Sequence, residues 1–158
     1  MDMMKEVLVI SSGIIKPSYF ARRNLSLMLT EFSNFNFHYS TSAEDLCLLS
    51  PESYSSVILL LKKGYVSLQA FKALEVFIMK GGGLLCLGAA SESFSDYPVY
   101  KEIIGGRLIS KTSSQPFSVE PRQTKRKVFS SPKRFVTKDS QLFHDLYGEA
   151  EVHYESNY

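Results

Sequence analysis

A glycine run, a short apolar strand and a turn of small residues form the segment of this sequence with the clearest chemical potential. It extends from Lys80 to Ala90 and reads Lys-Gly-Gly-Gly-Leu-Leu-Cys-Leu-Gly-Ala-Ala. In many α/β enzymes a turn of this kind presents a nucleophile above the edge of the sheet. Gly88 occupies the turn here and carries no side chain. The segment therefore predicts the scaffold of an active site without its central reagent.

Cys86 is the nucleophile nearest to this turn in the sequence. A catalytic thiol needs exposure and a neighbouring base or positive field. Strand alternation places Cys86 on the same face as Gly88, but its position inside the strand favours a buried, reduced thiol, which suits a reducing compartment. Cys47 lies far away, and the two cysteines have no metal or redox spacing.

Polar and aromatic residues follow the turn. Ser91, Glu92 and Ser93 could bind a polar ligand, although capping a helix or contacting solvent is the favoured interpretation. Tyr97 could stack on the apolar face of a sugar, or it could anchor a short helix into the core. Glu92 is therefore only a weak candidate for catalysis.

The three histidines, His38, His144 and His153, have no metal-ligand spacing. A zinc site usually needs three or four protein ligands, so the sequence predicts no metal site, and we expect no cofactor. We place His38 on an edge strand and His144 on a surface turn. His153 could line a cleft, which makes it a second weak catalytic candidate.

The elements that position these residues alternate between strand and helix in the first half of the chain. Three of the strands are continuous apolar runs, which indicates burial on both faces of a parallel sheet covered by helices. The other strand alternates and is expected near an edge. The strands are predicted at Val7–Ile10, Phe35–Tyr39, Ser56–Leu61 and Leu84–Leu87. Those beginning at Val7, Ser56 and Leu84 should be adjacent and parallel.

Two amphipathic helices connect these strands. The first opens near Pro17 and should bury one stripe, made of Leu25, Met28, Leu29 and Phe32. The second is expected to begin with Ser67 as its N-cap and to end at Lys80, burying Phe71, Leu74, Phe77 and Ile78. A short helical turn is predicted through Asp45 and Leu46.

The second half of the chain has shorter elements separated by polar loops. A short helix is predicted at Pro98–Ile104, and Leu142–Leu146 is expected to form a helical turn. Short strands are predicted at Arg107–Ser110, Phe117–Glu120, Val128–Phe129 and Glu151–Tyr154.

Ligands of parallel sheets bind beyond the carboxyl ends of the strands. We therefore predict a pocket there, with His153 as a further possible lining residue. Lys62 and the backbone N–H groups after Gly88 favour an anionic or hydroxyl-rich ligand. The predicted ligand-binding residues are Ser12, Gly13, Lys62, Gly88, Ala89, Ser91 and Tyr97.

Composition limits the class of protein. With 158 residues, one domain covering residues 1–158 is expected. A net charge of +2 is too small to imply a polyanionic partner, and the basic stretch 122–134 is interpreted mainly as a solvated hairpin, so nucleic acid is an unlikely partner. The longest aliphatic run, Val57–Leu61, is too short to cross a bilayer, and no signal peptide is recognised. A cytoplasmic protein is expected.

Five segments, in the same order, resemble the trehalose-utilisation (ThuA-like) family of the class I glutamine-amidotransferase-like superfamily. The resemblance covers most of the chain and implies a flavodoxin-like sheet and a carbohydrate-related ligand. The matching segments are Val7–Ile10, Lys80–Ala90, Tyr97–Gly106, the later positions Asp139, Leu142 and Leu146, and the closing pair Asn157-Tyr158.

The chain departs from this family at polar positions. The family usually has histidine at the turn, where amidotransferases have cysteine, and this chain has Gly88. The family's second histidine corresponds to Lys111. Its acidic residue corresponds to Tyr154, with Glu155 shifted by one position, which makes Glu155 a third weak catalytic candidate. The family domain also continues into further strands, so a sheet with an open edge is expected.

The sequence thus predicts an α/β, three-layer flavodoxin-like fold with a mostly parallel sheet, shortened at the C-terminus. The leading functional hypothesis is a degenerate ThuA-like domain with a binding or assembly role and without a catalytic residue at the turn, and a homodimer is expected. One alternative is an enzyme that acts on a carbohydrate-related substrate. The other is an accessory nucleic-acid binder that uses the basic stretch 122–134.

Overall fold

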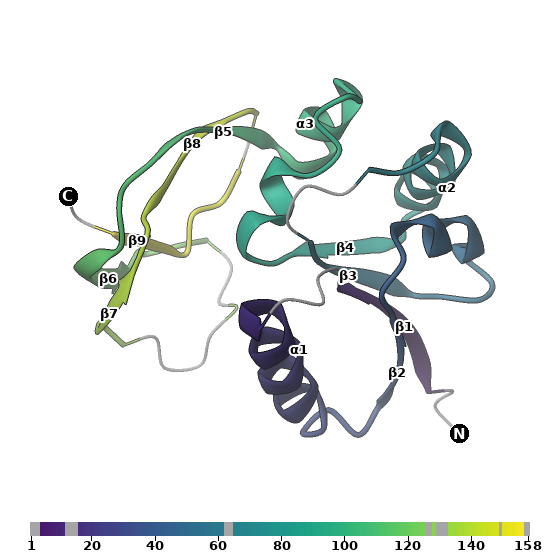
Figure 1. Ribbon diagram of the computed structural model, residues 1–158, viewed down its shortest axis with the longest axis horizontal. Coiled ribbons are helices and arrows are strands. Elements are labelled where there is room, and N and C mark those ends of the chain that lie inside the picture. The colour runs from purple at the N-terminus through teal and green to yellow at the C-terminus, as the bar shows by residue number, and fades with distance from the viewer. Residues whose placement is uncertain are drawn as a thin grey trace. The chain divides into compact units, whose positions relative to one another are not determined.

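The structure is a computed structural model that describes residues 4–11, 16–61, 65–125, 128, 133–148 and 150–156. The chain divides into two compact units, an N-terminal unit, Met1–Ile104, and a C-terminal unit, Gly105–Tyr158. Figure 1 shows both. Each is described by itself below, and the single domain expected from chain length stays a prediction.

A four-stranded parallel sheet forms the centre of the N-terminal unit. It contains β1 (Lys5–Ser11), β2 (Phe35–Ser40), β3 (Ser56–Leu60) and β4 (Gly83–Cys86) in the order β2-β1-β3-β4. The prediction that the first, third and fourth strands are adjacent and parallel is confirmed, and so is the edge position of the second. This order matches the first four strands of a flavodoxin-like sheet.

Helices lie on both faces of this sheet, as predicted. Figure 1 shows α1 (Lys16–Leu29) and α2 (Leu68–Met79) on opposite sides of it. The larger core lies on the α2 side, where Leu8, Ile10, Val57 and Leu59 pack with the helix. These strand residues are at most 2% exposed, which explains why their sequence is a continuous apolar run.

Ser67 starts α2 as the sequence predicted. Its side chain accepts a hydrogen bond from the Ala70 backbone N–H (3.2 Å), which is the usual N-cap contact. The carboxylate of Glu44, from the short 3₁₀ helix Ala43–Leu48, accepts hydrogen bonds from the Ser67 backbone N–H and hydroxyl, each at 2.6 Å. The negative charge of Glu44 at the N-terminus of α2 also interacts favourably with the helix dipole.

The α1 side of the sheet is covered less completely than predicted. Leu25 and Leu29 pack against Val7, Val9 and Ile58. The two other members of the predicted stripe do not, because α1 ends before Phe32 and its contact with the sheet is narrow: Met28 is 64% exposed and Phe32 is 54% exposed. The prediction of a four-residue buried stripe was therefore wrong for half of its members.

The connection from β4 to the second unit contains two short helical segments. A 3₁₀ helix, Gly88–Glu92, follows the strand directly, and α3 (Val99–Ile104) confirms the predicted short helix. Tyr100 of α3 is 2% exposed and belongs to the core on the α2 side. The segment after β4 is therefore anchored by a buried aromatic ring.

The C-terminal unit consists of two small antiparallel sheets. β5 (Gly106–Lys111) pairs with β8 (Leu142–Leu146). β6 (Gln115–Pro121) lies between β7 (Phe135–Asp139) and β9 (Tyr154–Ser156). The sequence predicted β5 and β6 with small differences in their bounds.

Three predictions for this unit were wrong. Leu142–Leu146 is a strand rather than a helical turn, because pairing with β5 decides its conformation and the four-residue spacing of the leucines does not. β7 was missed, whereas Val128 lies outside any strand and Phe129 lies outside the described residues. The last strand begins at Tyr154, three residues later than predicted, because its pairing with β6 begins there, where Tyr154 lies opposite Pro121.

No helix in the described part of the chain is long and apolar enough to cross a membrane.

Candidate functional site

The turn after β4 lies where the sequence predicts an active-site elbow. Gly88 lies directly beyond the strand with a φ of +58°, in the left-handed region that favours glycine. The turn is fixed on both sides of it, because the Leu87 N–H donates to the Leu59 carbonyl (2.9 Å) and the Ala90 N–H donates to the Leu87 carbonyl (3.2 Å). Among the described residues, a Cβ atom at Gly88 would meet nothing within 4 Å. The described residues thus leave space beyond the Gly88 Cα atom, but a side chain at this position would have to adopt the left-handed backbone conformation that L residues rarely adopt.

A cluster of aromatic rings holds the far side of this turn. The Tyr100 hydroxyl donates to the Ala90 carbonyl (2.7 Å), and the Tyr100 ring meets the Phe94 ring edge to face, with centroids 5.1 Å apart. Phe71 of α2 completes the cluster by stacking on Tyr97 at 4.1 Å. The rings join α2, the turn and α3, so the turn rests on a rigid base.

Phe94 is strained within this cluster. Its φ is +54°, which is rare for a bulky residue, and its side chain is 2% exposed. The Tyr97 N–H donates to the Phe94 carbonyl (2.9 Å) in the turn that leads into α3. Backbone strain of this kind costs about 1–3 kcal/mol and persists only where surrounding contacts fix it, often at functional sites. In this protein the aromatic contacts of the Phe94 ring hold its backbone in the strained conformation.

The Cys86 side chain packs against this core, and its surroundings do not suit a nucleophile. Its Sγ lies 3.4 Å from the Tyr100 hydroxyl, and the residue is half-buried on the α2 side of the sheet. Burial raises the pKa of the Cys86 thiol, against a smaller opposing effect of the hydrogen bond to Tyr100. The thiol is therefore protonated at neutral pH, and a protonated thiol is a poor nucleophile.

The other residues predicted to bind a ligand are placed only in part. Ser12, Gly13 and Lys62 lie outside the described residues. Ala89, Ser91 and Glu92 form the half-buried 3₁₀ helix after Gly88. The Tyr97 hydroxyl donates to the Val66 carbonyl (2.9 Å). This contact agrees with the second of the two roles predicted for Tyr97, which was to anchor the short helix α3.

Two buried hydroxyls lie near the carboxyl ends of the strands, at positions that are not among the ligand-binding residues predicted from the sequence. Ser11 ends β1 and is 5% exposed, and Ser93 follows the 3₁₀ helix at 1% exposed. Neither side-chain oxygen has a hydrogen-bond partner in the part of the chain that the structure describes. Buried hydroxyls are normally paired, so both mark positions where a polar partner would be favourable. No sequence signal separates such serines from ordinary turn residues.

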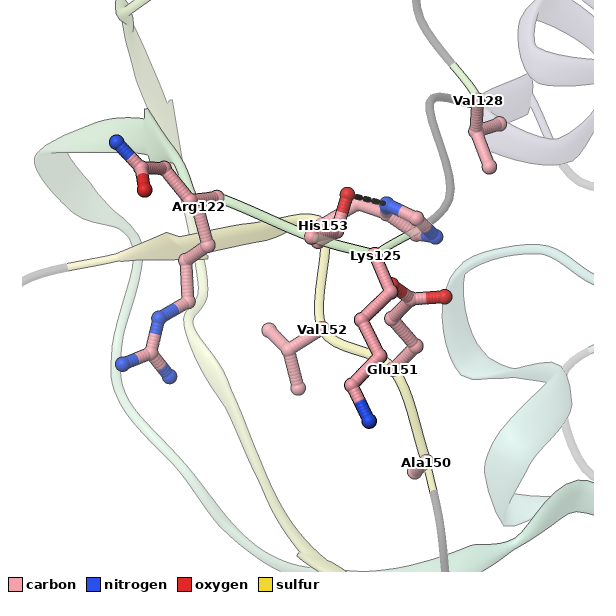
Figure 2. Close-up of a pocket in the computed structure, with 9 residues that line it drawn as sticks. Arg122, Lys125, Val128, Ala150, Glu151, Val152 and His153 are labelled. Carbon is pink, nitrogen blue, oxygen red and sulfur yellow. Dashed lines mark hydrogen bonds between the residues drawn. The ribbon is translucent and has the colours of Figure 1, made fainter.

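A second candidate site lies entirely in the C-terminal unit. A cavity of about 900 Å³ is lined by residues 122–125, Val128 and residues 150–153. Figure 2 shows these side chains around the open space. The Arg122 N–H donates to the His153 carbonyl (2.9 Å), which joins the two lining segments. Thr124 Oγ1 lies 3.2 Å from His153 Nδ1, which orients the ring.

The three weak catalytic candidates are distributed over both units. His153 lines the cavity, Glu155 pairs with Arg122 (3.2 Å), and Glu92 belongs to the N-terminal unit. In the described ranges no group of three or more histidine, cysteine, aspartate or glutamate side chains is arranged to hold a metal ion. Within the basic stretch, Arg134 pairs with Glu120 (3.5 Å), and Arg126 and Lys127 lie outside the described residues.

Comparison with solved structures identifies the fold. A ThuA-like protein from Bacteroides uniformis superposes with a TM-score of 0.68 at 15% identity, over 90% of this chain and 61% of that one. A ThuA-like protein from Parabacteroides merdae gives 0.70 at 16% identity, over 97% of this chain and 68% of that one. The chain has the ThuA-like fold.

The ThuA-like fold predicted from five sequence segments is thus confirmed by structure. This chain spans less than two thirds of the Bacteroides uniformis protein. No family model and no curated protein matches the sequence. At these identities the likeness establishes the fold, and activity has to be argued from the site itself.

Proposed function

We propose that this ThuA-like domain binds a ligand at the elbow end of its parallel sheet and carries out no hydrolytic or amidotransferase chemistry there. The observation behind the proposal is Gly88, which has a positive φ in the turn after β4, no described residue within 4 Å of a Cβ position, and no side chain. Covalent catalysis at such a turn requires a nucleophile placed next to a base. The proposed role is recognition.

Cys86 does not replace the missing nucleophile. Its sulfur contacts the Tyr100 hydroxyl inside the core, and burial raises its pKa. The backbone of Cys86 is also held within the sheet, where β4 pairs with β3 and Cys86 lies opposite Leu59. Both cysteines are free thiols, which supports the reducing cytoplasm as the proposed location.

The proposed ligand is small and hydroxyl-rich or anionic. Backbone N–H groups at the start of a helical turn favour such groups; Gly88 and Ala89 begin the short 3₁₀ helix after β4, and Ser91 lies in its later part. The buried hydroxyls of Ser11 and Ser93 support a polar occupant, because each lacks a partner among the described residues. Ser12, Gly13, Lys62 and Tyr97 remain part of the proposed lining.

A thermal-shift series with sugars, sugar phosphates and small carboxylates tests this site. We expect at least one compound to raise the melting temperature of the wild type and to have no effect on Gly88→Leu, whose side chain would occupy the space above the turn. Gly81→Leu is the matched control: Gly81 precedes the same strand, has a φ of +91° and has no described residue within 4 Å of a Cβ position. It shares the backbone strain and leaves the elbow open.

Stabilisation that survives in Gly88→Leu would place the ligand elsewhere and contradict the elbow site. Loss of stabilisation in both variants would indicate general destabilisation, and a set of compounds that stabilises none of the three proteins would remove the binding role.

Self-association is a second proposed role, because α1 leaves large apolar side chains uncovered. Tyr19, Phe20, Leu27 and Met28 are each more than half exposed, and Leu85 on the edge strand β4 is 50% exposed. Clustered apolar surface and unpaired strand edges commonly mark interfaces, and a two-fold pair of identical chains is the commonest closed assembly. We propose a homodimer that uses the outer face of α1.

Light scattering at high micromolar concentration measures this assembly. The wild type should have the mass of a dimer, and Leu27→Glu should shift it to a monomer, because a charge in an apolar interface is costly. Leu48→Glu is the control, since Leu48 is similarly exposed (56%, against 58% for Leu27) on a different element. A wild-type protein that stays monomeric would remove the assembly role.

A further inference from the structure

We propose that the cavity of the C-terminal unit is a binding site for a small ligand that carries a phosphate or carboxylate on a partly apolar skeleton. This site is separate from Gly88 and its proposed role, because every residue that lines it belongs to the C-terminal unit. The two sites can therefore be tested independently. A volume of about 900 Å³ lies within the range of small-molecule sites.

The cavity owes its shape to the end of a strand pair. β6 and β9 are paired as far as Pro121 and Tyr154, and Arg122 still donates its backbone N–H to the His153 carbonyl (2.9 Å). Beyond that bond the segments 122–125 and 150–153 form the two walls. The contact between Thr124 Oγ1 and His153 Nδ1 (3.2 Å) joins the walls a second time, so part of the site is preorganised.

The charged groups of the lining favour an anion. Figure 2 shows the side chains of Arg122 and Lys125 extending to the same side of their segment, with Val152 between them. Arg122 is partly neutralised by Glu155 at 3.2 Å, a half-exposed pair that is weak in solvent. Lys125 forms no ion pair within the described part of the chain, so its ammonium group is the cation best able to accept a ligand anion.

The other lining residues determine which chemical groups the rest of the ligand can carry. Val128, Ala150 and Val152 contribute apolar surface, and Gln123 and Thr124 contribute polar groups. Glu151 is the acidic residue of the lining, and it disfavours a second negative charge on that wall. This combination fits a ligand with one anionic group and an apolar body better than a highly charged polymer.

The test is an NMR titration with three probes that share a ring: phenyl phosphate, benzoate and the neutral benzyl alcohol. The two anions should shift amide signals of residues 122–125 and 150–153, and the alcohol should bind at least about fivefold more weakly, as expected for a lost charged hydrogen bond at a partly exposed site. The relative affinities of phenyl phosphate and benzoate identify the preferred anion. Binding should also weaken as salt is raised.

Three variants establish which charge acts. Lys125→Ala should raise the dissociation constant of the preferred anion about fivefold, and Lys125→Arg should largely retain binding because the charge remains. Glu151→Gln should lower the constant, because it removes the opposing charge. Lys138→Ala is the matched control: it removes one exposed lysine of the same unit, on β7 and outside the lining.

Equal affinity for the alcohol and the anions would overturn the proposal, and so would equal effects of Lys125→Ala and Lys138→Ala. Binding of a single-stranded oligonucleotide that neither small anion displaces would also overturn it, in favour of a nucleic-acid role for the basic stretch. Arg122 is not used as a probe, because its substitution would also break the pair with Glu155.

Discussion

Replacing Phe71 with alanine should lower the free energy of unfolding of the N-terminal unit by about 4 kcal/mol, as for other fully buried phenylalanines. The side chain is 3% exposed and belongs to the core on the α2 side of the sheet. Its ring stacks on Tyr97 with centroids 4.1 Å apart and meets Phe94 (6.2 Å) and Tyr100 (6.4 Å) edge to face. Each aromatic pair adds about 0.5–1.5 kcal/mol beyond the burial itself.

Urea unfolding of Phe71→Ala and of Phe32→Ala measures this effect against a matched control. Phe32 is the same residue type in the same unit but is 54% exposed, so its loss should cost less than about 1 kcal/mol. Because the ring cluster supports the turn after β4, the amides of residues 88–93 should also exchange faster with solvent in Phe71→Ala. Equal effects of the two substitutions on stability would contradict the role assigned to the cluster.

Gly82→Ala should be destabilising even though the backbone there suits any residue. Gly82 does not have a positive φ, but a Cβ atom would fall within the ring of Phe77, which is 1% exposed and cannot move aside freely. The Gly82 N–H also donates to the Phe77 carbonyl (3.0 Å), which fixes the approach. Overpacking costs about 1–3 kcal/mol, and this exceeds the gain of about 0.4–1 kcal/mol from removing a glycine.

A double-mutant cycle with Phe77→Leu isolates this contact. Leucine removes the ring atoms that the new methyl group would meet, so Gly82→Ala should cost at least about 1 kcal/mol less in the Phe77→Leu background. Urea unfolding of the four proteins gives the coupling. A Gly82→Ala cost that is the same in both backgrounds would show that the clash with Phe77 is not the reason for this glycine.

The parallel sheet could be predicted from sequence because each buried strand has a strong apolar signal within its own residues. β1 and β3 are buried on both faces, so Val7–Ile10 and Val57–Leu60 are continuous apolar runs with no competing pattern. The C-terminal unit gives weaker signals. Its small sheets bury few residues fully, and β7, with the sequence Phe-Val-Thr-Lys-Asp, is largely exposed. Pairing partners decide these strands, and a single sequence does not reveal the partners.

Some features of the candidate sites could likewise be predicted from sequence, whereas others depend on contacts between distant residues. The elbow at Gly88 could be predicted, since a glycine after an apolar strand identifies a turn. The positive φ of Phe94 and the contact between Cys86 and Tyr100 depend on residues brought together by packing. The cavity of the C-terminal unit depends on the pairing of β6 with β9, whose segments are about thirty residues apart in sequence. His153 was predicted to line a different cleft, at the carboxyl ends of the parallel strands, and Lys125 was interpreted only as one charge of a basic stretch.

Ammonia release from glutamine tests the central claim, that the elbow presents no nucleophile, most directly. The purified wild-type protein and Cys86→Ser should both release ammonia only at the rate of the buffer, because Gly88 has no side chain and the Cys86 thiol is protonated inside the core. Release by the wild type that Cys86→Ser abolishes would contradict the account, since it would show that Cys86 reaches substrate and acts as the nucleophile.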